Sequence, residues 1–345
     1  MPILAELFLV ALLLACYAGY KYYSAARGNK RAVETGLGPI EPMSGGWARG
    51  PAQHRPFKPI YHITMALKNA APSDWITIDS DFTSRLSLRG RLLSEKGRGV
   101  HGVVPGGEAA VMDLYNSLYA YLPARYPDIF TTKANQLHNK LNGAYFPLSP
   151  PDPLEALQNI ATTVEEDFFL LVQEPSGHRC VAFVCCFPSG FDPASKLGKG
   201  LGAIHAPVPS YERIGPSMER FFGKVQVGKP VTRMNWAVQV DGVLFNSGSN
   251  HIVGEDQEDV DPDSVDVSQA HLRVEHQTLT RLPDSKALVF SFKTYLYPLS
   301  QVKAEGLGPQ FADAIEGLQK GNAPGMWTYK AAVRWGPKSV EYLRS

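Results

Sequence analysis

The sequence predicts an α+β protein built on a mainly antiparallel sheet that helices flank. Two β-rich runs, 167–174 and 180–188, are separated by the turn sequence PSGHR, which is typical of a β-hairpin. Three more β-rich runs follow, at 231–240, 272–282 and 287–299. Most of these runs are connected by turns, or in one case by a longer segment of the chain. Connections of this kind join antiparallel neighbours, and helices are expected to pack on the resulting sheet.

Helices are predicted before the hairpin and after the last strand. Segment 108–127 places five apolar side chains on one helical face: Val111, Leu114, Leu118, Tyr121 and Leu122. This helix is expected to end before Pro123, because proline has no backbone N–H to donate within a helix. Helical spacing also continues through 82–95, after a short strand or turn at 75–82. A short helix is predicted at 309–320.

Residues 1–24 are predicted to be a membrane anchor. Segment 3–20 contains one charge, Glu6, and at about 1.5 Å per residue a helix of this length nearly spans a hydrocarbon core. A cleaved signal peptide is the alternative, but no Lys or Arg precedes the apolar run. Four basic residues follow the run, so the positive-inside rule predicts a cytosolic C-terminal part: Lys21, Arg27, Lys30 and Arg31.

The remaining chain is divided by composition. Residues 25–56 are rich in Pro and Gly and are predicted to form a linker or extended arm. The main domain is expected to span 57–320, with an acidic, solvated loop at 254–269 that contains no basic residue. Residues 321–345 are predicted to be a C-terminal tail.

Composition and charge exclude some classes of protein. The chain has 345 residues, of which 44% are hydrophobic and 19% charged, so it can bury a substantial core. Its net charge is +1 and no basic stripe runs along it, so nucleic acid is not an expected partner. The four cysteines lack the paired CxxC spacing of a metal site and are interpreted as reduced structural thiols.

His205 is a candidate for chemistry because its backbone surroundings are stiff. Pro207 and Pro209 fix their own φ and push the residues before them toward extended conformations, while Gly200 and Gly202 let the backbone approach another group closely. A histidine on such a segment suits a metal or heme ligand, whose nitrogen must be held in a fixed position. The alternative is a buried histidine that bonds a carbonyl in a tight turn.

Polar side chains on two predicted strands are further candidates. One strand contains TRMNWAV at 232–238, and the other contains LRVEHQT at 272–278. Alternation places Arg273, Glu275 and Gln277 on one face of the second strand. Such a row suits heme propionates, a substrate amine or a proton relay. The alternative is the solvated face of an antiparallel sheet.

An ordered series of motifs resembles the heme-dependent oxidative N-demethylase family. The series runs from WITIDSDF and YLPARYPDIF through EEDFFLLVQE and FPSGFDPASKLGKGLGAIHAPVP to RMNWAV and LRVEHQTLTRLP, over about residues 57–318. The resemblance implies a PAS-like fold, in which an antiparallel sheet flanked by helices carries heme b. It also implies O₂-dependent oxidation at the N-methyl carbon of a small amine, with release of formaldehyde.

The resemblance also suggests residue roles. His205 lies in the segment that matches the family's IHxPVP motif, and it is expected to be the axial iron ligand. Arg273 and Glu275 match positions of the family motifs, and their place in the polar row on one strand face makes them the expected catalytic residues. Heme or pocket contacts are expected from four neighbours: Arg233, Asn235, Trp236 and Gln277. The family pattern has an arginine at the position of His276. The role of that arginine is therefore not expected of His276.

The sequence therefore predicts a single-pass membrane protein of the endoplasmic reticulum whose large cytosolic domain is a heme monooxygenase. Expected partners are a small-molecule substrate, O₂, membrane lipid and an electron-donating reductase. The resemblance implies the reductase, a flavin or iron–sulfur protein, since this chain has no nucleotide-binding fold and no cysteine cluster to hold either group itself. A non-enzymatic PAS-like heme or small-ligand sensor or carrier is the alternative. A lumenal glycosyltransferase, suggested by the DSD triplet at 79–81, disagrees with the anchor's charge asymmetry.

Overall fold

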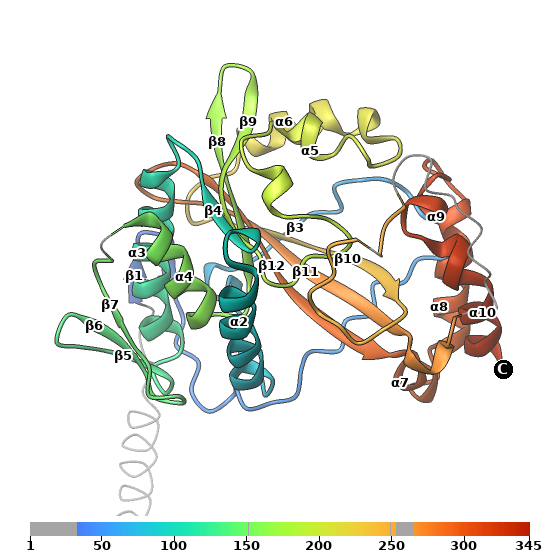
Figure 1. The fold of residues 1–345 in the computed structure, drawn as a ribbon, viewed down its shortest axis with the longest axis horizontal. Coiled ribbons are helices and arrows are strands. Elements are labelled where there is room, and N and C mark those ends of the chain that lie inside the picture. The colour runs from blue at the N-terminus through green and yellow to red at the C-terminus, as the bar shows by residue number, and fades with distance from the viewer. Residues whose placement is uncertain (1–32, 151, 249, 253–264) are drawn as a thin grey trace, which may run out of the picture.

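A seven-stranded antiparallel sheet runs through the middle of the molecule (Figure 1). The computed structural model describes residues 33–150, 152–248, 250–252 and 265–345. Along the sheet the strand order is β3-β10-β11-β12-β8-β9-β4, and every neighbouring pair is antiparallel. The strands are β3 (Lys68–Asn69), β4 (His101–Val103), β8 (Asp167–Glu174), β9 (Gly177–Val184), β10 (Val231–Gln239), β11 (His271–Arg281) and β12 (Leu288–Pro298). The predicted α+β class, the hairpin and the three later strands are confirmed.

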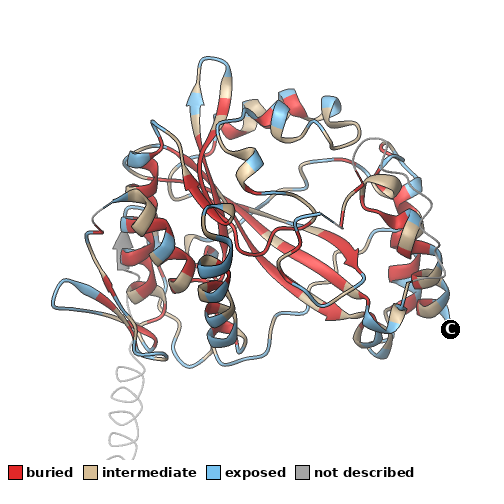
Figure 2. Cartoon of the chain, in the orientation of Figure 1, coloured by how far each residue is buried: buried red, intermediate tan, exposed pale blue. Residues whose placement is uncertain are grey.

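Helices pack on both faces of this sheet and leave its middle strands buried (Figure 2). The helices of the first half are α2 (Phe82–Lys96), α3 (Glu108–Arg125) and α4 (Pro153–Thr163). Those of the second half are α5 (Leu201–Ile204), α6 (Gly215–Phe222), α7 (Leu299–Ala304), α8 (Gly308–Glu316), α9 (Met326–Tyr329) and α10 (Ala332–Arg344). Short 3-10 turns include η1 (Pro72–Asp74), η3 (Ala194–Lys196) and η4 (Tyr211–Arg213).

Alternation along β8 separates two of the three cores. Phe168 and Leu170 point to the core that contains α2, α3 and α4, whereas Phe169 and Leu171 point to the core beside α5 and α6. The third core joins β10, β11 and β12 to α7, α8, α9 and α10. The functional side chains of the later strands can therefore face either the α5–α6 side or the C-terminal helices, according to residue parity.

A small three-stranded sheet extends from the α3 end of the molecule. It consists of β5 (Phe130–Lys133), β6 (Gln136–Asn139) and β7 (Tyr145–Pro147) in that order. Within the region expected to be an arm, β1 (Val33–Thr35) pairs with β2 (Gly38–Ile40). Residues 41–56 contain no helix or strand.

Two helical boundaries differ from the sequence predictions. α3 continues through Pro123 to Arg125, because the proline removes only its own N–H bond and the Tyr126 amide still donates to the Leu122 carbonyl at 2.8 Å. Residues 321–345 contain α9 and α10 in place of a tail. Trp335 and Leu343 of α10 are each 2% exposed, so this helix belongs to the third core.

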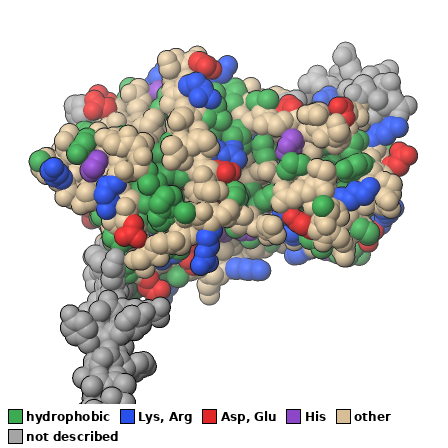
Figure 3. All heavy atoms as spheres, turned by 90° about the horizontal axis from the view of Figure 1, so that it is seen from below, with side chains coloured by type: hydrophobic (Ala, Val, Ile, Leu, Met, Phe, Trp, Pro, Cys, Tyr) green, Lys and Arg blue, Asp and Glu red, His purple; other side chains and the backbone are tan. Residues whose placement is uncertain are grey.

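No helix among the described residues is long and apolar enough to cross a membrane. The anchor predicted at 1–24 lies outside the described residues, as does most of the acidic loop predicted at 254–269. On the face drawn in Figure 3, Lys and Arg side chains are interspersed with Asp and Glu side chains. This distribution fits the net charge of +1.

Candidate functional site

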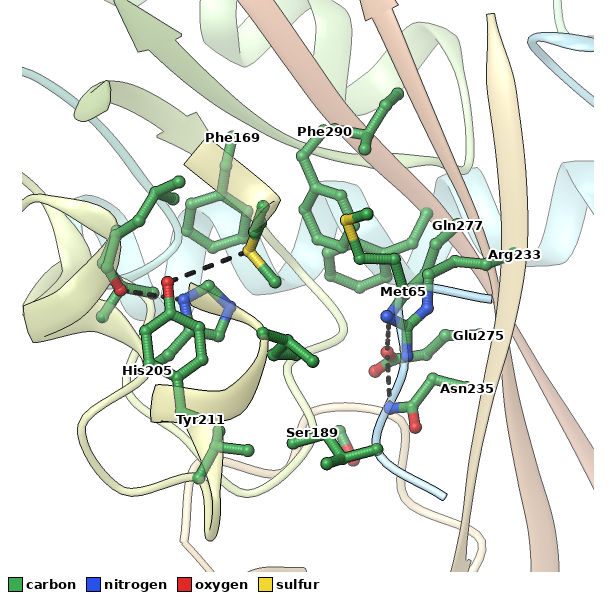
Figure 4. Close-up of a pocket in the computed structure, with 18 of the residues that line it drawn as sticks. Met65, Phe169, Ser189, His205, Tyr211, Arg233, Asn235, Glu275, Gln277 and Phe290 are labelled. Carbon is green, nitrogen blue, oxygen red and sulfur yellow. Dashed lines mark hydrogen bonds between the residues drawn. The ribbon is translucent and has the colours of Figure 1, made fainter. Parts of the chain in front are cut away.

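An open cavity of about 290 Å³ lies between the sheet and the segment that carries α5, η4 and α6 (Figure 4). Residues of β8, β10, β11 and β12 form the sheet side, and residues from 61–67 and α9 also contribute. Much of the lining is apolar, including Met65, Phe169, Phe191, Leu279, Phe290 and Phe292. A concave apolar site with a few polar groups is the usual form of a cofactor or small-molecule site.

His205 lines the cavity from the α5 side. It ends α5, and its Nδ1 lies 2.9 Å from the carbonyl oxygen of Leu201, one turn earlier. Its ring stacks on the Tyr211 ring, with centroids 4.8 Å apart and planes 6° from parallel. Because a carbonyl oxygen only accepts hydrogen bonds, this contact places the imidazole proton on Nδ1 and leaves a lone pair on Nε2.

The electrostatic surroundings of His205 favour the neutral ring. Burial lowers its pKa, the bond to Leu201 opposes this effect, and the nearby cations Lys196 and Arg233 lower the pKa further. A neutral imidazole whose second nitrogen donates to a backbone carbonyl is the usual state of a metal-binding histidine. His205 thus combines the two interpretations of the sequence, because it bonds a carbonyl and also presents a nitrogen for coordination.

Neither Gly200 nor Gly202 makes the close approach expected from the sequence, because a Cβ atom added at Gly200 would lie 3.7 Å from the His178 carbonyl oxygen, an ordinary contact. A Cβ atom added at Gly202 would meet no other atom within 4 Å. The rigidity of the segment comes instead from backbone bonds around the histidine, where the His205 amide donates to Leu201 at 3.0 Å and the Val208 amide donates to His205 at 2.8 Å. These bonds fix the turn that leads into the two prolines.

Four predicted polar residues meet on the opposite wall of the cavity (Figure 4). In the register of β10 with β11, Arg233 pairs with Gln277 and Asn235 pairs with Glu275. Side chains of paired residues lie on one face of a sheet, so all four project into the cavity. Glu275 accepts hydrogen bonds on Oε2 from Gln277 Nε2 at 2.8 Å and from Asn235 Nδ2 at 3.5 Å. Glu275 Oε1 has no donor among the described residues.

Arg233 brings a positive charge to this wall without pairing it. Its Nε is buried and has no hydrogen-bond partner within the described parts of the chain. Burial lowers the pKa of Arg233, while the nearby Tyr61 and Glu275 raise it. Within the described residues, Arg233 and Glu275 form no ion pair at 4.0 Å or less. The cavity therefore contains opposite charges that do not neutralise each other by contact.

Lys330, in the turn after α9, is a cavity residue that the sequence reasoning missed. Its side chain is 2% exposed, and its Nζ donates to Asn235 Oδ1 at 3.1 Å and to the carbonyl of Trp236. Burial lowers the pKa of Lys330 to about 8, against the opposing effect of Glu275. The only signal in the sequence is a single lysine between the aromatic and apolar residues of WTYKAAV, which does not distinguish a buried amine from an exposed one.

Two predicted site residues lie outside the cavity. Trp236 has the opposite parity to Arg233 and Asn235, so its ring faces the C-terminal helices and contacts Phe311 with centroids 5.3 Å apart. It therefore does not supply a flat surface for a cofactor in this cavity. Arg273 shares the face of Glu275, but it is 1% exposed and donates to backbone carbonyls of Phe187, Pro188 and Leu244. These bonds make Arg273 a positioning residue for the chain around Ser189, which lines the cavity.

The family model described as haem-dependent oxidative N-demethylase, alpha subunit-like, matches residues 66–340. The chain belongs to this family. The matched region includes residues from both walls of the cavity, among them His205, Glu275 and Lys330. Membership of this family indicates that the protein is an oxidative, heme-dependent enzyme.

The residues of this cavity fit a heme group. His205 could supply one coordinating nitrogen, because its ring is oriented by Leu201 and burial favours its neutral form. The phenylalanines on β8 and β12 offer flat apolar surfaces for a porphyrin, and Lys196 beside His205 offers a cation for a propionate. Lys196 donates to the Ile204 carbonyl at 3.2 Å, so its charge is held next to His205.

Proposed function

We propose that this protein is a heme-dependent monooxygenase that removes an N-methyl group from a small amine. The observation that carries the proposal is the arrangement of His205, with an acceptor nitrogen at the cavity, opposite a polar wall that contains Glu275. Family membership supports the oxidative use of heme. The alternative of a heme or ligand sensor predicts binding in the same cavity without turnover.

His205 would hold the iron through Nε2, with Leu201 fixing its tautomer and Tyr211 fixing its plane. The heme would be of the b type, because none of the four cysteines stands in the CxxCH motif that attaches heme covalently. Heme supplies the activation of O₂. The overall step consumes the amine, one O₂, two electrons and two protons, and yields water and an N-hydroxymethyl amine. That product then separates into formaldehyde and the shortened amine.

Glu275 would bind the nitrogen of the substrate. Its Oε2 is held by Gln277 and Asn235, whereas its Oε1 is available to a protonated amine. A charge-assisted hydrogen bond of this kind fixes the position of the nitrogen and therefore of the methyl carbon attached to it. Asn235 and Gln277 position the carboxylate, and Arg273 positions the backbone next to them.

The proposal also covers the source of electrons, the membrane location and the type of domain. Electrons would come from a separate flavin or iron–sulfur reductase, since the sequence contains no binding motif for either group. The apolar segment at 3–20 would anchor the chain in the endoplasmic reticulum membrane with the enzyme in the cytosol. The antiparallel sheet with helices on both faces agrees with a PAS-like domain.

A heme titration of the full-length chain tests the central claim. We expect a Soret band at a stoichiometry of one heme per chain, its loss or marked shift in His205→Gly, and its recovery when imidazole is added to that variant. His138→Gly is the matched control, because His138 lies in the small β5–β7 sheet, stacked on Tyr145. A wild-type chain that binds no heme would contradict the proposal.

Turnover separates an enzyme from a sensor. With a chemical or enzymatic electron source, the heme-loaded protein should release formaldehyde and the shortened amine in equal amounts. Reversible gas or ligand binding without either product, across a panel of methylated amines, would favour the sensor. Glu275→Gln should lower kcat/KM for cationic amines while leaving the Soret band in place.

A further inference from the structure

We infer that the substrate is an N-methyl amino acid, recognised at its ammonium by Glu275 and at its carboxylate by Arg233. This inference deepens the proposed function by naming a substrate class for the same cavity. It starts from the fact that two opposite charges lie on one cavity wall without forming an ion pair. A pair of this kind is complementary to a ligand that itself carries both charges.

The register of β10 and β11 sets the spacing of the two charges. Arg233 is opposite Gln277, and Glu275 is opposite Asn235, so Arg233 and Glu275 are diagonal neighbours on one face. The Cβ atoms of such neighbours are roughly 7–8 Å apart or somewhat less. An amino acid carries its ammonium and carboxylate on the same carbon atom. With a charge-assisted bond of about 2.8 Å at each end, it can bridge side chains at this spacing.

The two neighbouring residues keep the charged groups apart. Gln277 and Asn235 both donate to Oε2 of Glu275, so the carboxylate is held by uncharged donors. Lys330 in turn donates to Oδ1 of Asn235, so the amide of Asn235 is oriented with its NH₂ group toward Glu275. Glu275 is thereby fixed without the help of Arg233, whose guanidinium stays available.

Arg233 is better placed than Lys330 to bind a carboxylate. Lys330 already uses its ammonium on Asn235 and on the Trp236 carbonyl, whereas Arg233 has no hydrogen-bond partner among the residues that the structure describes. A guanidinium binds a carboxylate through two parallel hydrogen bonds, which an ammonium group cannot do. The buried Nε of Arg233 also gains from a ligand that supplies an acceptor, because an unsatisfied buried donor is costly.

The test compares three probes that share a methylated amine. N-methylglycine carries both charges, N-methylglycinamide keeps the ammonium but loses the carboxylate, and dimethylamine is the ammonium alone. Calorimetry on the full-length chain, with and without heme, should show that N-methylglycine binds the wild type most tightly. In Arg233→Gln, the affinity for N-methylglycine relative to N-methylglycinamide should fall about 30-fold, the lower end of the range for removing one partner of a hydrogen-bonded charge pair, because Arg233 is only partly buried.

Matched variants keep the result interpretable. Arg233→Lys retains the charge and should restore part of the preference, while Glu275→Gln should weaken all three probes. Arg213→Gln is the control, because Arg213 is an exposed arginine of η4. Equal binding of N-methylglycine and its amide by the wild type would overturn the inference. So would an Arg233→Gln variant that loses heme affinity but keeps the same ratio of probe affinities, because Arg233 would then hold a propionate.

The two proposals fail in different ways. Absence of a Soret band in the wild type would contradict the proposed function, and the calorimetric ratio measured without heme would still decide the role of Arg233. A heme-loaded enzyme that demethylates dimethylamine as efficiently as N-methylglycine would support the function and overturn the substrate class.

Discussion

Arg89 and Asp167 form an ion pair that is almost completely removed from solvent, with 2.6 Å between Nη1 and Oδ1. Arg89 also donates to the carbonyls of Ala161, Glu165 and Glu166, at the end of α4 and just after it. Asp167 accepts from the backbone amides of Cys186 and Phe187, each at 2.8 Å. The pair thus connects α2 and the end of α4 to the segment that follows β9 and leads to the cavity.

Removing the charge of Asp167 should destabilise the fold strongly. Asp167→Asn leaves the Arg89 guanidinium buried without a counter-ion, a change that typically costs about 3–5 kcal/mol of unfolding free energy. Urea denaturation would measure it. Asp313→Asn is the control, because Asp313 pairs with Arg344 on the exposed surface and should contribute little. Similar losses in both variants would contradict the structural role given to the buried pair.

Glu166 should make the protein less stable as the pH rises. Burial raises its pKa to about 7, against the opposing effects of Lys293 and of the Thr77 amide, which donates to Oε1 at 2.8 Å. The folded chain therefore keeps this proton up to about pH 7, whereas the unfolded chain releases it near 4.5. Between these values the folded state binds more protons than the unfolded state, so the free energy of unfolding falls with increasing pH.

Glu166→Gln should remove that pH dependence, because glutamine resembles the protonated acid. Compared with the wild type, the variant should gain stability between pH 5 and pH 8, as measured by urea unfolding at both values. The control is Glu341→Gln, an exposed position on α10. A difference between variant and wild type that is independent of pH would show that the Glu166 proton is not involved.

His54 should make the protein less stable as the pH falls. Its ring contacts Tyr295 edge-on at 4.9 Å and lies 5.3 Å from the ring of His276, and burial, followed by His276, lowers its pKa to about 4. The unfolded chain takes up this proton near pH 6.5 and the folded chain only near pH 4. Stability contributed by the neutral ring is thus present above 6.5 and is lost as the pH falls toward 4.

Melting temperatures at pH 7 and pH 5 would test the role of His54. His54→Phe keeps a ring but cannot be protonated, so the drop in Tm between these pH values should be smaller in the variant than in the wild type. His62→Phe is the matched control at an exposed position of the same N-terminal region. An unchanged drop in His54→Phe would mean that other groups carry the acid sensitivity.

Gly308 should be intolerant of any side chain. A Cβ atom at this position would lie 2.2 Å from the carbonyl oxygen of Leu343, so Gly308→Ala forces α8 and α10 apart. Overpacking of this kind typically costs about 1–3 kcal/mol, and more where backbone must move. Gly202→Ala is the comparison, since nothing lies within 4 Å of its added Cβ and alanine favours the helical conformation of α5. A thermal melt should show a lower Tm for the first variant alone.

The sheet was largely predictable because its strands carry dense β-branched and aromatic residues between clear turn signals. Parity along β11 also predicted correctly that Glu275 and Gln277 share a face. The position of α10 was not predictable, since its contacts with α8 depend on residues distant in the chain. Local propensity also predicts the wrong end for α3. The helix continues through Pro123 because its last turn is packed, with Leu122 and Ala124 buried.

The candidate site was predictable for residues whose neighbours restrict them and unpredictable for those that depend on packing. His205 stands in a segment rich in Gly and Pro, and the structure places it in the cavity. Trp236 and Arg273 occur in equally distinctive motifs, but parity directs one away from the cavity and backbone carbonyls bind the other. Lys330 has no motif, and only the folded contacts with Asn235 and Trp236 reveal it.

The bond from Lys330 to the Trp236 carbonyl has a consequence for biosynthesis. A nascent chain exposes its segments in order, and His205 emerges long before Lys330. The histidine side of the cavity can therefore form while the opposite wall still lacks the lysine that orients Asn235. Insertion of the cofactor during translation would then meet an unfinished pocket, and the complete lining would exist only after the ribosome had synthesised the segment that contains α9 and Lys330.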